Sequence, residues 1–539
     1  MMHVRSWQVV RDASTRRTLT DIATHERCLP IQPGLGYVLG IDASAWLSSG
    51  TPIEEMVITR GPNPVLAAAF HRLAKILKAP VAALFVFEGN QLPEARRQKH
   101  AATHPDWAVE GLKSLIMAFG FCFHEVSCRW RRRIASLPPV RSSSSGTCDS
   151  PDPIQAPGEA VAELARLNEL GLVDTVVSDD ARSALLFGAE TVTRNVDPYT
   201  PDRISTVAHV HLTDVIHNRV PLSRAALVLV ALLTGGGTSE VCCVLNRDAI
   251  RACTDQIHVW LAFQGIDGFD IDVAFRLVRY NIAEELVQLA QGPDTDAHQD
   301  RVDRWVDRLR TLLCVDPSGH LGGNHEALAT AVATAMGFPD LDAVRACYSP
   351  CTSEHPDLLA INCEWCLPDI DGLLQFCMEH FHWRAGAELA KNMHKTIWPG
   401  VCFRVLLAAP TGMNLGPLLP LSMAGLGAPA PSRPACNKER VRAFILKTDL
   451  DVRTSRLGPV MYRVECDIST FHARLCAAVG SRGPELVFLS QPCELVVPVQ
   501  VLHDAYPGCV RGGMGPYLAP ALEPQHNSVI DLTLDSDSE

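Results

Sequence analysis

The feature that most constrains the fold is an alternation of strand-like and helix-like segments along the first half of the chain. "YVLGIDASAWL", "PVAALFVFEG" and "GLVDTVVSDD" are apolar runs typical of buried strands, whereas "PVLAAAFHRLAKILKA" and "WAVEGLKSLIMAFG" have helical spacing. A further apolar run, "AALVLVALLTGGG", ends in three glycines. Strands that alternate with helices form a mostly parallel sheet covered by helices. We therefore predict an α/β domain.

Acidic residues follow the predicted strands at equivalent places. Asp42, Glu88 and the pair Asp179 and Asp180 each stand where an apolar run ends, and Glu159 opens a predicted helix in "APGEAVAELARL". The carboxyl ends of parallel strands meet at one edge of a sheet, where ligands bind. Clustered carboxylates suit Mg2+, which prefers oxygen ligands. Taken singly, each could equally be a turn residue, or a first-turn residue that complements a helix dipole.

Composition limits the classes of protein to be considered. The net charge of −12 argues against general nucleic-acid binding, so any such contact requires a local basic patch. The 47% hydrophobic content supports large cores, and the 19 cysteines have no framework spacing. The N-terminus "MMHVRSWQVV" lacks a signal-peptide core, and no charge-free apolar window could span a bilayer. We expect an intracellular protein with free thiols and no membrane contact.

Six blocks of sequence resemble the XPG/flap-endonuclease family. In order, they are "LGIDASAWL", "LFVFEGNQLPEARRQKH", "APGEAVAELARLNELGLVDTVVSDD", "LLFGAETVTRN", "LLTGGG" and "GIDGFDIDVAFRLVR", within about residues 1–290. The resemblance implies a PIN-like nuclease fold, Mg2+, and cleavage of flaps or branched junctions during nuclear DNA repair or recombination. "FPDLDAVRACYSP", "LPDIDGLLQFC" and the segment near Tyr462 resemble the fungal Holliday-junction-resolvase-like branch, in which a chromodomain-like module follows the nuclease core.

The family's metal-binding positions match this chain incompletely. The resemblance implies that Asp42, Glu88, Glu159 and Asp180 are catalytic and bind Mg2+, with Asp179 as an alternative ligand in this register. Elsewhere the chain departs from the pattern: the expected carboxylates are replaced at three positions, namely Val161, Arg182 or Ser183, and Gly237. An inward-pointing Arg182 would repel a cation. The chain is therefore interpreted as a divergent nuclease or, alternatively, as a catalytically impaired pseudonuclease that binds branched DNA or protein partners.

The family's DNA-binding elements are present in part. Arg96, Arg97 and Lys99 could contact phosphates, although such residues could equally form a solvated charged face. "GIDGFDIDVAFRLVR" resembles a helix-hairpin-helix, in which Gly265 and Gly268 would let backbone N–H groups approach phosphates. Asp270 stands where a third glycine is expected and would place negative charge there.

The predicted organisation has nine segments. They are the nuclease region 1–125, a basic, Ser-rich insert 126–155, a second nuclease region 156–237, an insert 238–264, a helix-hairpin-helix-like element 265–295, a helical region 300–407, a Pro/Gly linker 408–436, a chromodomain-like module 437–510, and a disordered acidic tail 511–539. The two inserts lack core periodicity; they are either surface loops or gene-model artefacts.

Two further motifs lie outside the six blocks. Cys347, Cys351, Cys363 and Cys366 have tolerable zinc spacing, but we favour free thiols in a helical core. The tail "VIDLTLDSDSE" resembles a SUMO-interacting motif with Val529, Ile530, Asp531, Leu532 and Thr533 at its centre. An extended peptide of this type can add a strand to a partner's sheet edge. The alternative is an unremarkable acidic terminus.

Overall fold

The chain is described here from a computed structural model. It covers the residues in the ranges 13–26, 36–47, 63–88, 106–124, 159–178, 181–194, 207–212, 215–217, 220–235, 265–293, 296–350, 352, 366–383, 386–411, 413–415, 418–419, 433–451, 460–480 and 491–506. Both predicted inserts, the basic segment that holds Arg96, Arg97 and Lys99, and the acidic tail lie outside these ranges.

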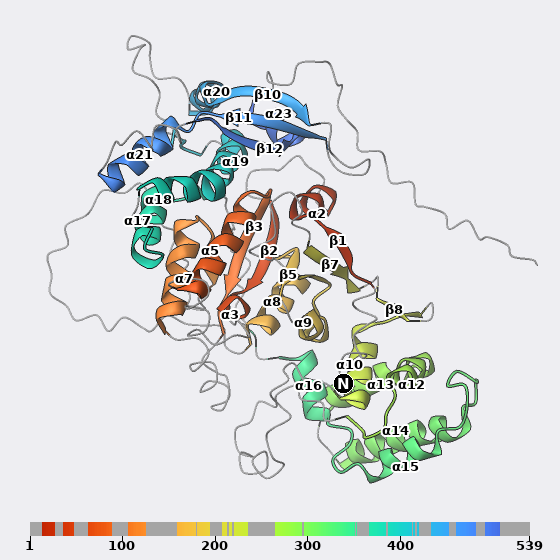
Figure 1. Ribbon diagram of the computed structural model, residues 1–539. Coiled ribbons are helices and arrows are strands. Elements are labelled where there is room, and N and C mark those ends of the chain that lie inside the picture. The colour runs from red at the N-terminus through yellow and green to blue at the C-terminus, as the bar shows by residue number, and fades with distance from the viewer. Residues whose placement is uncertain are drawn as a thin grey trace, which may run out of the picture.

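A seven-stranded sheet occupies the centre of the described chain, in the order β1-β7-β6-β5-β2-β3-β4 (Figure 1). Its strands are β1 (Thr15–Arg17), β2 (Tyr37–Asp42), β3 (Val81–Val86), β4 (Cys122–His124), β5 (Thr175–Val177), β6 (Thr191–Arg194) and β7 (Val207–His211). β6, β5, β2, β3 and β4 are mutually parallel, whereas β7 is antiparallel to both of its neighbours. The predicted α/β class with a mostly parallel sheet is confirmed.

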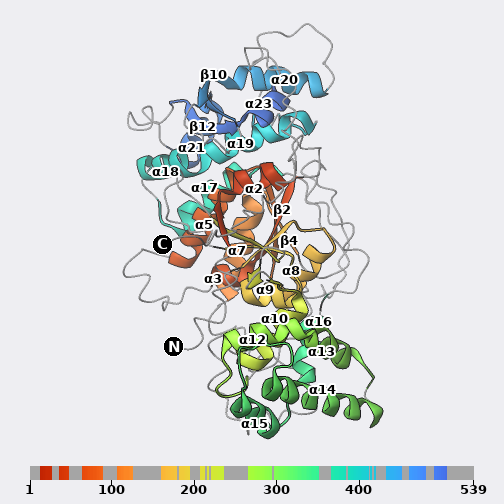
Figure 2. The ribbon, with the colours of Figure 1, turned by 90° about the vertical axis from the view of Figure 1, so that its right-hand side faces the viewer.

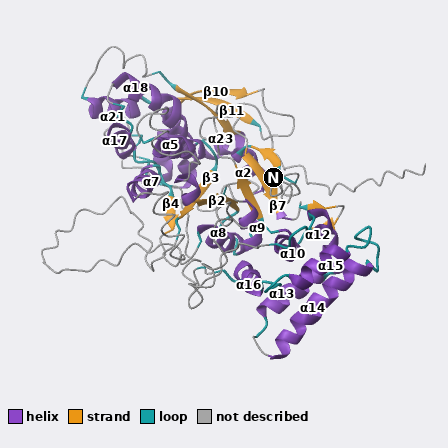
Figure 3. Cartoon of the chain, turned by 60° about the horizontal axis from the view of Figure 1, so that its bottom comes forward, coloured by secondary structure: helices purple, strands orange, loops and turns teal. Residues whose placement is uncertain are grey.

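Helices cover both faces of the sheet, as Figure 3 shows. One face carries α2 (Leu19–Glu26), α3 (Ala43–Leu47), α5 (Pro64–Leu77) and α7 (Asp106–Ala118). The other carries α8 (Ala160–Glu169), α9 (Ala181–Phe187) and α10 (Arg224–Thr234). Alternate strand residues enter opposite cores: Leu39 and Phe85 pack on the α5 side, while Val38 and Leu84 pack on the α8 side.

A helical lobe extends from the α8 face of the sheet (Figure 2). It contains α12 (Ile271–Leu277), a short 3-10 turn η5 (Val278–Tyr280), α13 (Ile282–Gln291), α14 (Asp296–Val315), α15 (Glu326–Thr334) and α16 (Leu341–Tyr348). A two-stranded ribbon, β8 (Ile216–His217) and β9 (Val220–Pro221), precedes α10. The lobe contributes to the same core as α8, α9 and α10, so it is packed on the sheet domain through its apolar side chains.

The C-terminal unit, from α17 to α23, combines helices with a small antiparallel sheet. Its elements are α17 (Ile370–His380), α18 (Gly386–Asn392), η7 (Met393–Ile397), α19 (Trp398–Ala408), η8 (Ala409–Thr411), α20 (Arg433–Phe444), β10 (Ile445–Asp451), β11 (Met461–Cys466), α21 (Ser469–Val479), β12 (Cys493–Pro498) and α23 (Val499–Ala505). The strand order is β10-β11-β12, both pairs antiparallel. The predicted helical region and small β-rich C-terminal unit are confirmed. α20 begins at Arg433, inside the segment predicted as a linker, and Pro434 falls in its first turn, where proline is tolerated.

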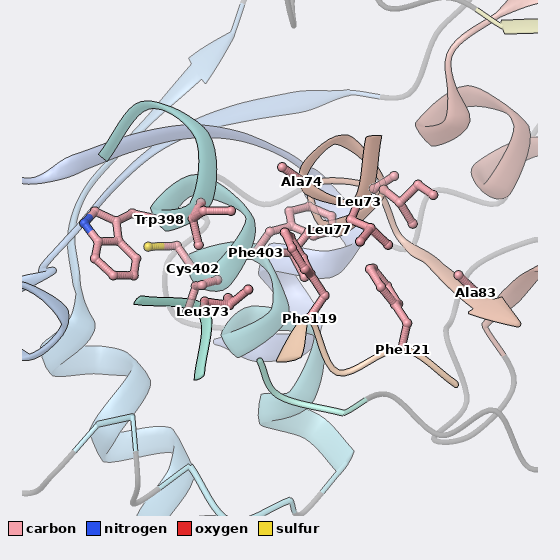
Figure 4. Packing of buried hydrophobic residues seen from close by; sticks show 14 of the residues in the cluster. Leu73, Ala74, Leu77, Ala83, Phe119, Phe121, Leu373, Trp398, Cys402 and Phe403 are labelled. Carbon is pink, nitrogen blue, oxygen red and sulfur yellow. The ribbon is translucent and has the colours of Figure 1, made fainter. Parts of the chain in front are cut away.

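The C-terminal unit shares one hydrophobic core with the α5 face of the sheet domain. In Figure 4, Phe403 of α19 lies beside Leu77 of α5, whereas Trp398 and Cys402 lie on the opposite side of α19. Val464 and Val497 of the small sheet belong to the same cluster as Leu39 and Phe85 of the large sheet. The unit is thus integrated into the fold through a continuous apolar interior.

Gly40 of β2 lies directly against α8 and the segment that follows it. A Cβ atom there would lie 2.6 Å from Cγ1 of Val173 and 2.7 Å from Cδ2 of Leu164. We expect Gly40→Ala to lower the free energy of unfolding by about 1–3 kcal/mol, because a well-packed core resists an added methyl group. Chemical denaturation checks this value. An unchanged midpoint would show that α8 can move away from β2 without cost.

Candidate metal-binding site at the carboxyl edge of the sheet

Asp42 and Glu88 lie at the carboxyl ends of neighbouring strands. Asp42 is the last residue of β2, and Glu88 stands two residues after the last residue of β3; each is 6% exposed. Asp42 is paired with Val86 in the parallel register. By strand alternation, both carboxylates extend to the α8 side, since Val38 and Val86 pack in that core. The structure therefore brings these two predicted residues to one edge and one face.

The N-terminus of α8 meets this edge. Glu159 is the N-cap residue of α8, with an extended backbone and a half-buried side chain. The backbone N–H of Ala160 donates a hydrogen bond to Oε2 of Glu88 over 3.3 Å. Glu159 is therefore adjacent in sequence to a residue that Glu88 contacts directly.

The remaining predicted ligands are only partly placed. β5 ends at Val177, which is followed by the buried Ser178. Because Val177 pairs with Ile41, the end of β5 lies beside that of β2. Asp179 and Asp180 come next in sequence but lie outside the described residues.

The structure describes three of the positions at which the chain departs from the family pattern. Val161 is 8% exposed and belongs to the apolar core on the α8 side of the sheet. Arg182 lies half-buried in the first turn of α9, and the neighbouring Ser183 is buried. Gly237 lies outside the described residues.

One acidic residue of α8 was missed by sequence reasoning. Glu163 is 0% exposed and lies one helical turn after Glu159. The signal was present in the sequence, because residues four apart lie on one side of a helix. Helical spacing in "GEAVAELARL" could have singled out this second carboxylate.

The carboxylates of Asp42, Glu88 and Glu159 are chemically suitable ligands for a hard cation. The described residues alone do not form a complete metal site. Carboxylate oxygens are suitable Mg2+ ligands. Within the described ranges, however, no three His, Cys, Asp or Glu side chains are grouped so that they could hold a metal ion. A site at this edge would consequently need a ligand from outside the described residues, such as Asp179 or Asp180.

The predicted DNA-binding glycines, Gly265 and Gly268, lie in the turn that precedes α12. Gly265 has a φ of 69° and Gly268 a φ of 81°, both in the left-handed region that favours glycine. A Cβ on Gly265 would lie 2.4 Å from the backbone N of Gly235, so the turn is packed tightly behind α10. Asp270 has a structural role as the N-cap of α12, where its side chain accepts the N–H of Asp272 at 3.1 Å.

The cysteines of the possible zinc motif are only partly described. Cys347 is a buried free thiol and Cys366 an exposed one, whereas Cys351 and Cys363 lie outside the described ranges. Burial raises the pKa of the Cys347 thiol; nearby Arg224 opposes this shift, and the charge of Glu159 adds to it. A raised pKa disfavours the thiolate form that binds zinc.

Residues 152–237 match the XPG I-region family. This stretch includes Glu159, all of α8 and α9, and the end of β5, which together carry much of the candidate edge. None of the described helices is long and apolar enough to cross a bilayer.

Curated relatives of the chain are nucleases. It is 25% identical over 217 residues to human "Flap endonuclease GEN homolog 1", covering 38% of this chain and 21% of the relative. It is 28% identical over 177 residues to "Exodeoxyribonuclease 1" of Schizosaccharomyces pombe, covering 30% and 29%. The matched stretches thus span less than a third of these relatives. The chain is therefore similar to these nucleases over part of its length.

Solved structures show the same fold over most of the chain. The junction-resolving enzyme GEN-1 in its caesium-bound form aligns with a TM-score of 0.62 and 20% identity, over 94% of this chain and 97% of that one. The Holliday junction-resolving enzyme GEN1 in complex with product DNA and a Mg2+ ion aligns with a TM-score of 0.59 and 20% identity, over 93% and 96%. The described chain has a GEN1-like fold, including the C-terminal three-stranded sheet.

Proposed function

We propose that the chain is a divergent, Mg2+-dependent structure-specific endonuclease that cuts flaps or branched junctions in nuclear DNA repair or recombination. The observation that carries the proposal is the pair of buried carboxylates, Asp42 and Glu88, at the carboxyl edge of the sheet beside the start of α8. The GEN1-like fold supports a junction or flap as substrate. This also agrees with the resemblance to the fungal branch of Holliday-junction-resolvase-like proteins.

In this proposal, Asp42, Glu88 and Glu159 hold the cation together with Asp179 or Asp180. Bound Mg2+ would activate a water molecule for attack and stabilise the leaving oxygen of the phosphodiester. Asp42 and Glu88 would supply ligands from fixed strand ends, while α8 would hold Glu159 near them. Arg96, Arg97 and Lys99 would contact phosphates, and Gly265 and Gly268 would let the backbone approach the duplex.

A panel of labelled substrates tests this function. The full chain is incubated with a 5′ flap, a four-way junction, a linear duplex and a single strand in Mg2+, and binding is measured in parallel with Ca2+. We expect products from the flap or junction and none from the linear duplex. Equal cleavage of all four substrates would contradict structure specificity.

The second candidate function is a non-cleaving protein that binds branched DNA or a protein partner. Two observations favour it: Val161 places an apolar side chain where the family has a carboxylate, and the described donors do not form a group of three. Tight binding of the junction without product in the same assay would support this candidate and reject the nuclease.

We also propose that the C-terminal tail binds SUMO, using Val529, Ile530, Leu532 and the acidic residues that follow. We expect a peptide spanning residues 527–539 to bind with micromolar-class affinity, since strand addition would be assisted by charge complementarity. A titration followed by chemical shifts measures this affinity. The Ile530→Ala, Leu532→Ala peptide is the control, and an equal response from both peptides would rule the motif out.

A further inference from the structure

The first turn of α8 is anchored by a side chain from the sheet. Its N-cap residue, Glu159, makes no side-chain capping hydrogen bond. Oε2 of Glu88 instead accepts the N–H of Ala160, a buried contact between residues 72 positions apart. Because the first N–H groups of a helix have no partner within the helix, an acceptor from elsewhere stabilises that end.

Four other helices of the described chain are closed by the side chains of their own N-cap residues. The hydroxyl of Ser223 accepts from Ala226 in α10, and carboxylates do the same in three more helices. These are Asp270 for α12, Asp340 for α16 and Asp369 for α17. α8 differs from them in that the acceptor comes from the end of β3.

The length of Glu88 matters for this contact. The Ala160 N to Glu88 Oε2 distance of 3.3 Å is already at the long end for such a bond. An aspartate in the same place would end about 1.5 Å short, the length of one carbon–carbon bond. The negative charge of Glu88 also lies at the positive end of the α8 dipole, where a carboxylate is stabilised.

We propose that Glu88 is a positioning residue, which ties the first turn of α8, and with it Glu159, to the carboxyl end of β3. The side chain of Glu88, longer than that of an aspartate, spans the distance from strand to helix, while its charge still contributes to the cation site. The second half of this inference rests on the proposed function; the first half does not.

Three substitutions separate the two roles. Glu88→Gln keeps a carbonyl oxygen that can accept from Ala160 but removes the charge. Glu88→Asp keeps the charge but is too short to reach the amide, and Glu88→Ala removes both. Glu169→Gln is the matched control, because it removes an exposed carboxylate from the opposite end of α8.

Hydrogen exchange followed by mass spectrometry, in the presence of a chelator, measures how firmly Glu88 holds the first turn of α8. We expect exchange at the start of α8 to be about fivefold faster in Glu88→Ala and Glu88→Asp, comparable to the loss of a helix cap. Exchange should be at most about twofold faster in Glu88→Gln, which loses the charge but keeps the acceptor, and unchanged in Glu169→Gln. Wild-type exchange in Glu88→Ala, or equally fast exchange in Glu88→Gln and Glu88→Asp, would overturn the proposal. The Gln and Asp variants decide the result even if Glu88→Ala does not fold.

Titration calorimetry with Mn2+ tests whether the charge of Glu88 contributes to cation binding. We expect Glu88→Asp to bind within about threefold of the wild type and Glu88→Gln to bind at least about tenfold more weakly, since a neutral amide is a poorer ligand than a carboxylate. Equal affinity for Mn2+ in Glu88→Asp and Glu88→Gln would show that the charge of Glu88 does not contribute to cation binding. Failure of the wild type to bind Mn2+ would instead count against the proposed nuclease and leave the exchange result standing.

Discussion

Asp42→Asn is expected to reduce the rate of Mg2+-dependent cleavage of a flap or junction at least about a hundredfold, because it removes a charged ligand from the carboxyl edge of the sheet. The amide has nearly the same shape as the carboxylate. Asp42 is 6% exposed at the end of a fully buried strand, so the isosteric replacement should leave the fold intact. Single-turnover cleavage and circular dichroism measure the two effects.

Asp307→Asn is the control for this variant. Asp307 lies on α14 with an exposed side chain that pairs only at the surface with Arg310, and surface pairs of this kind contribute little to stability. It should cleave at the wild-type rate. If Asp42→Asn also cleaves at that rate, the carboxyl edge of the sheet is not the catalytic site.

Arg404→Ala is expected to lower the free energy of unfolding by about 3 kcal/mol. Arg404 is 3% exposed on α19 and donates to the backbone oxygens of Ile76, at 3.0 Å, and Leu77, at 3.2 Å. Its guanidinium also lies 5.3 Å from the centre of the Phe121 ring. Burial lowers the pKa of Arg404 to about 9.

The physical reason is that Arg404 closes the C-terminal end of α5, where backbone oxygens have no partner within the helix. Arg404→Lys should restore only part of the lost stability, because a single ammonium cannot reproduce the fork of the guanidinium. Arg310→Ala, at an exposed site on α14, is the matched control. Equal denaturation midpoints for Arg404→Ala and Arg310→Ala would contradict a structural role for Arg404.

The sequence was most informative where structure is set by local pattern. The runs ending at Asp42 and Glu88 became buried parallel strands, because apolar residues on both sides of a strand require helices on both faces. The positions of these carboxylates at one edge followed from that topology. Their chemical role as ligands stays a prediction.

Contacts between distant segments could not be predicted from local pattern. Nothing near Glu88 in the sequence indicates that its side chain reaches Ala160, because the contact depends on how α8 lies across β3. The merging of the C-terminal unit with the α5 face is similar, since Arg404 and Ile76 meet only in the folded chain. The sequence predicts that Asp270 disturbs a phosphate contact. In the structure Asp270 caps α12, and its place directly before "IDVAF" is compatible with that role.

We propose that the carboxyl edge of the sheet supports cation-dependent cleavage of branched DNA. The most direct test is the single-turnover rate of cleavage of a labelled four-way junction and a labelled flap by the full chain, measured over a series of Mg2+ concentrations. We expect a rate that rises with Mg2+, saturates, and is lost in Asp42→Asn. A junction and a flap that both bind tightly yet remain uncut at every Mg2+ concentration would contradict it.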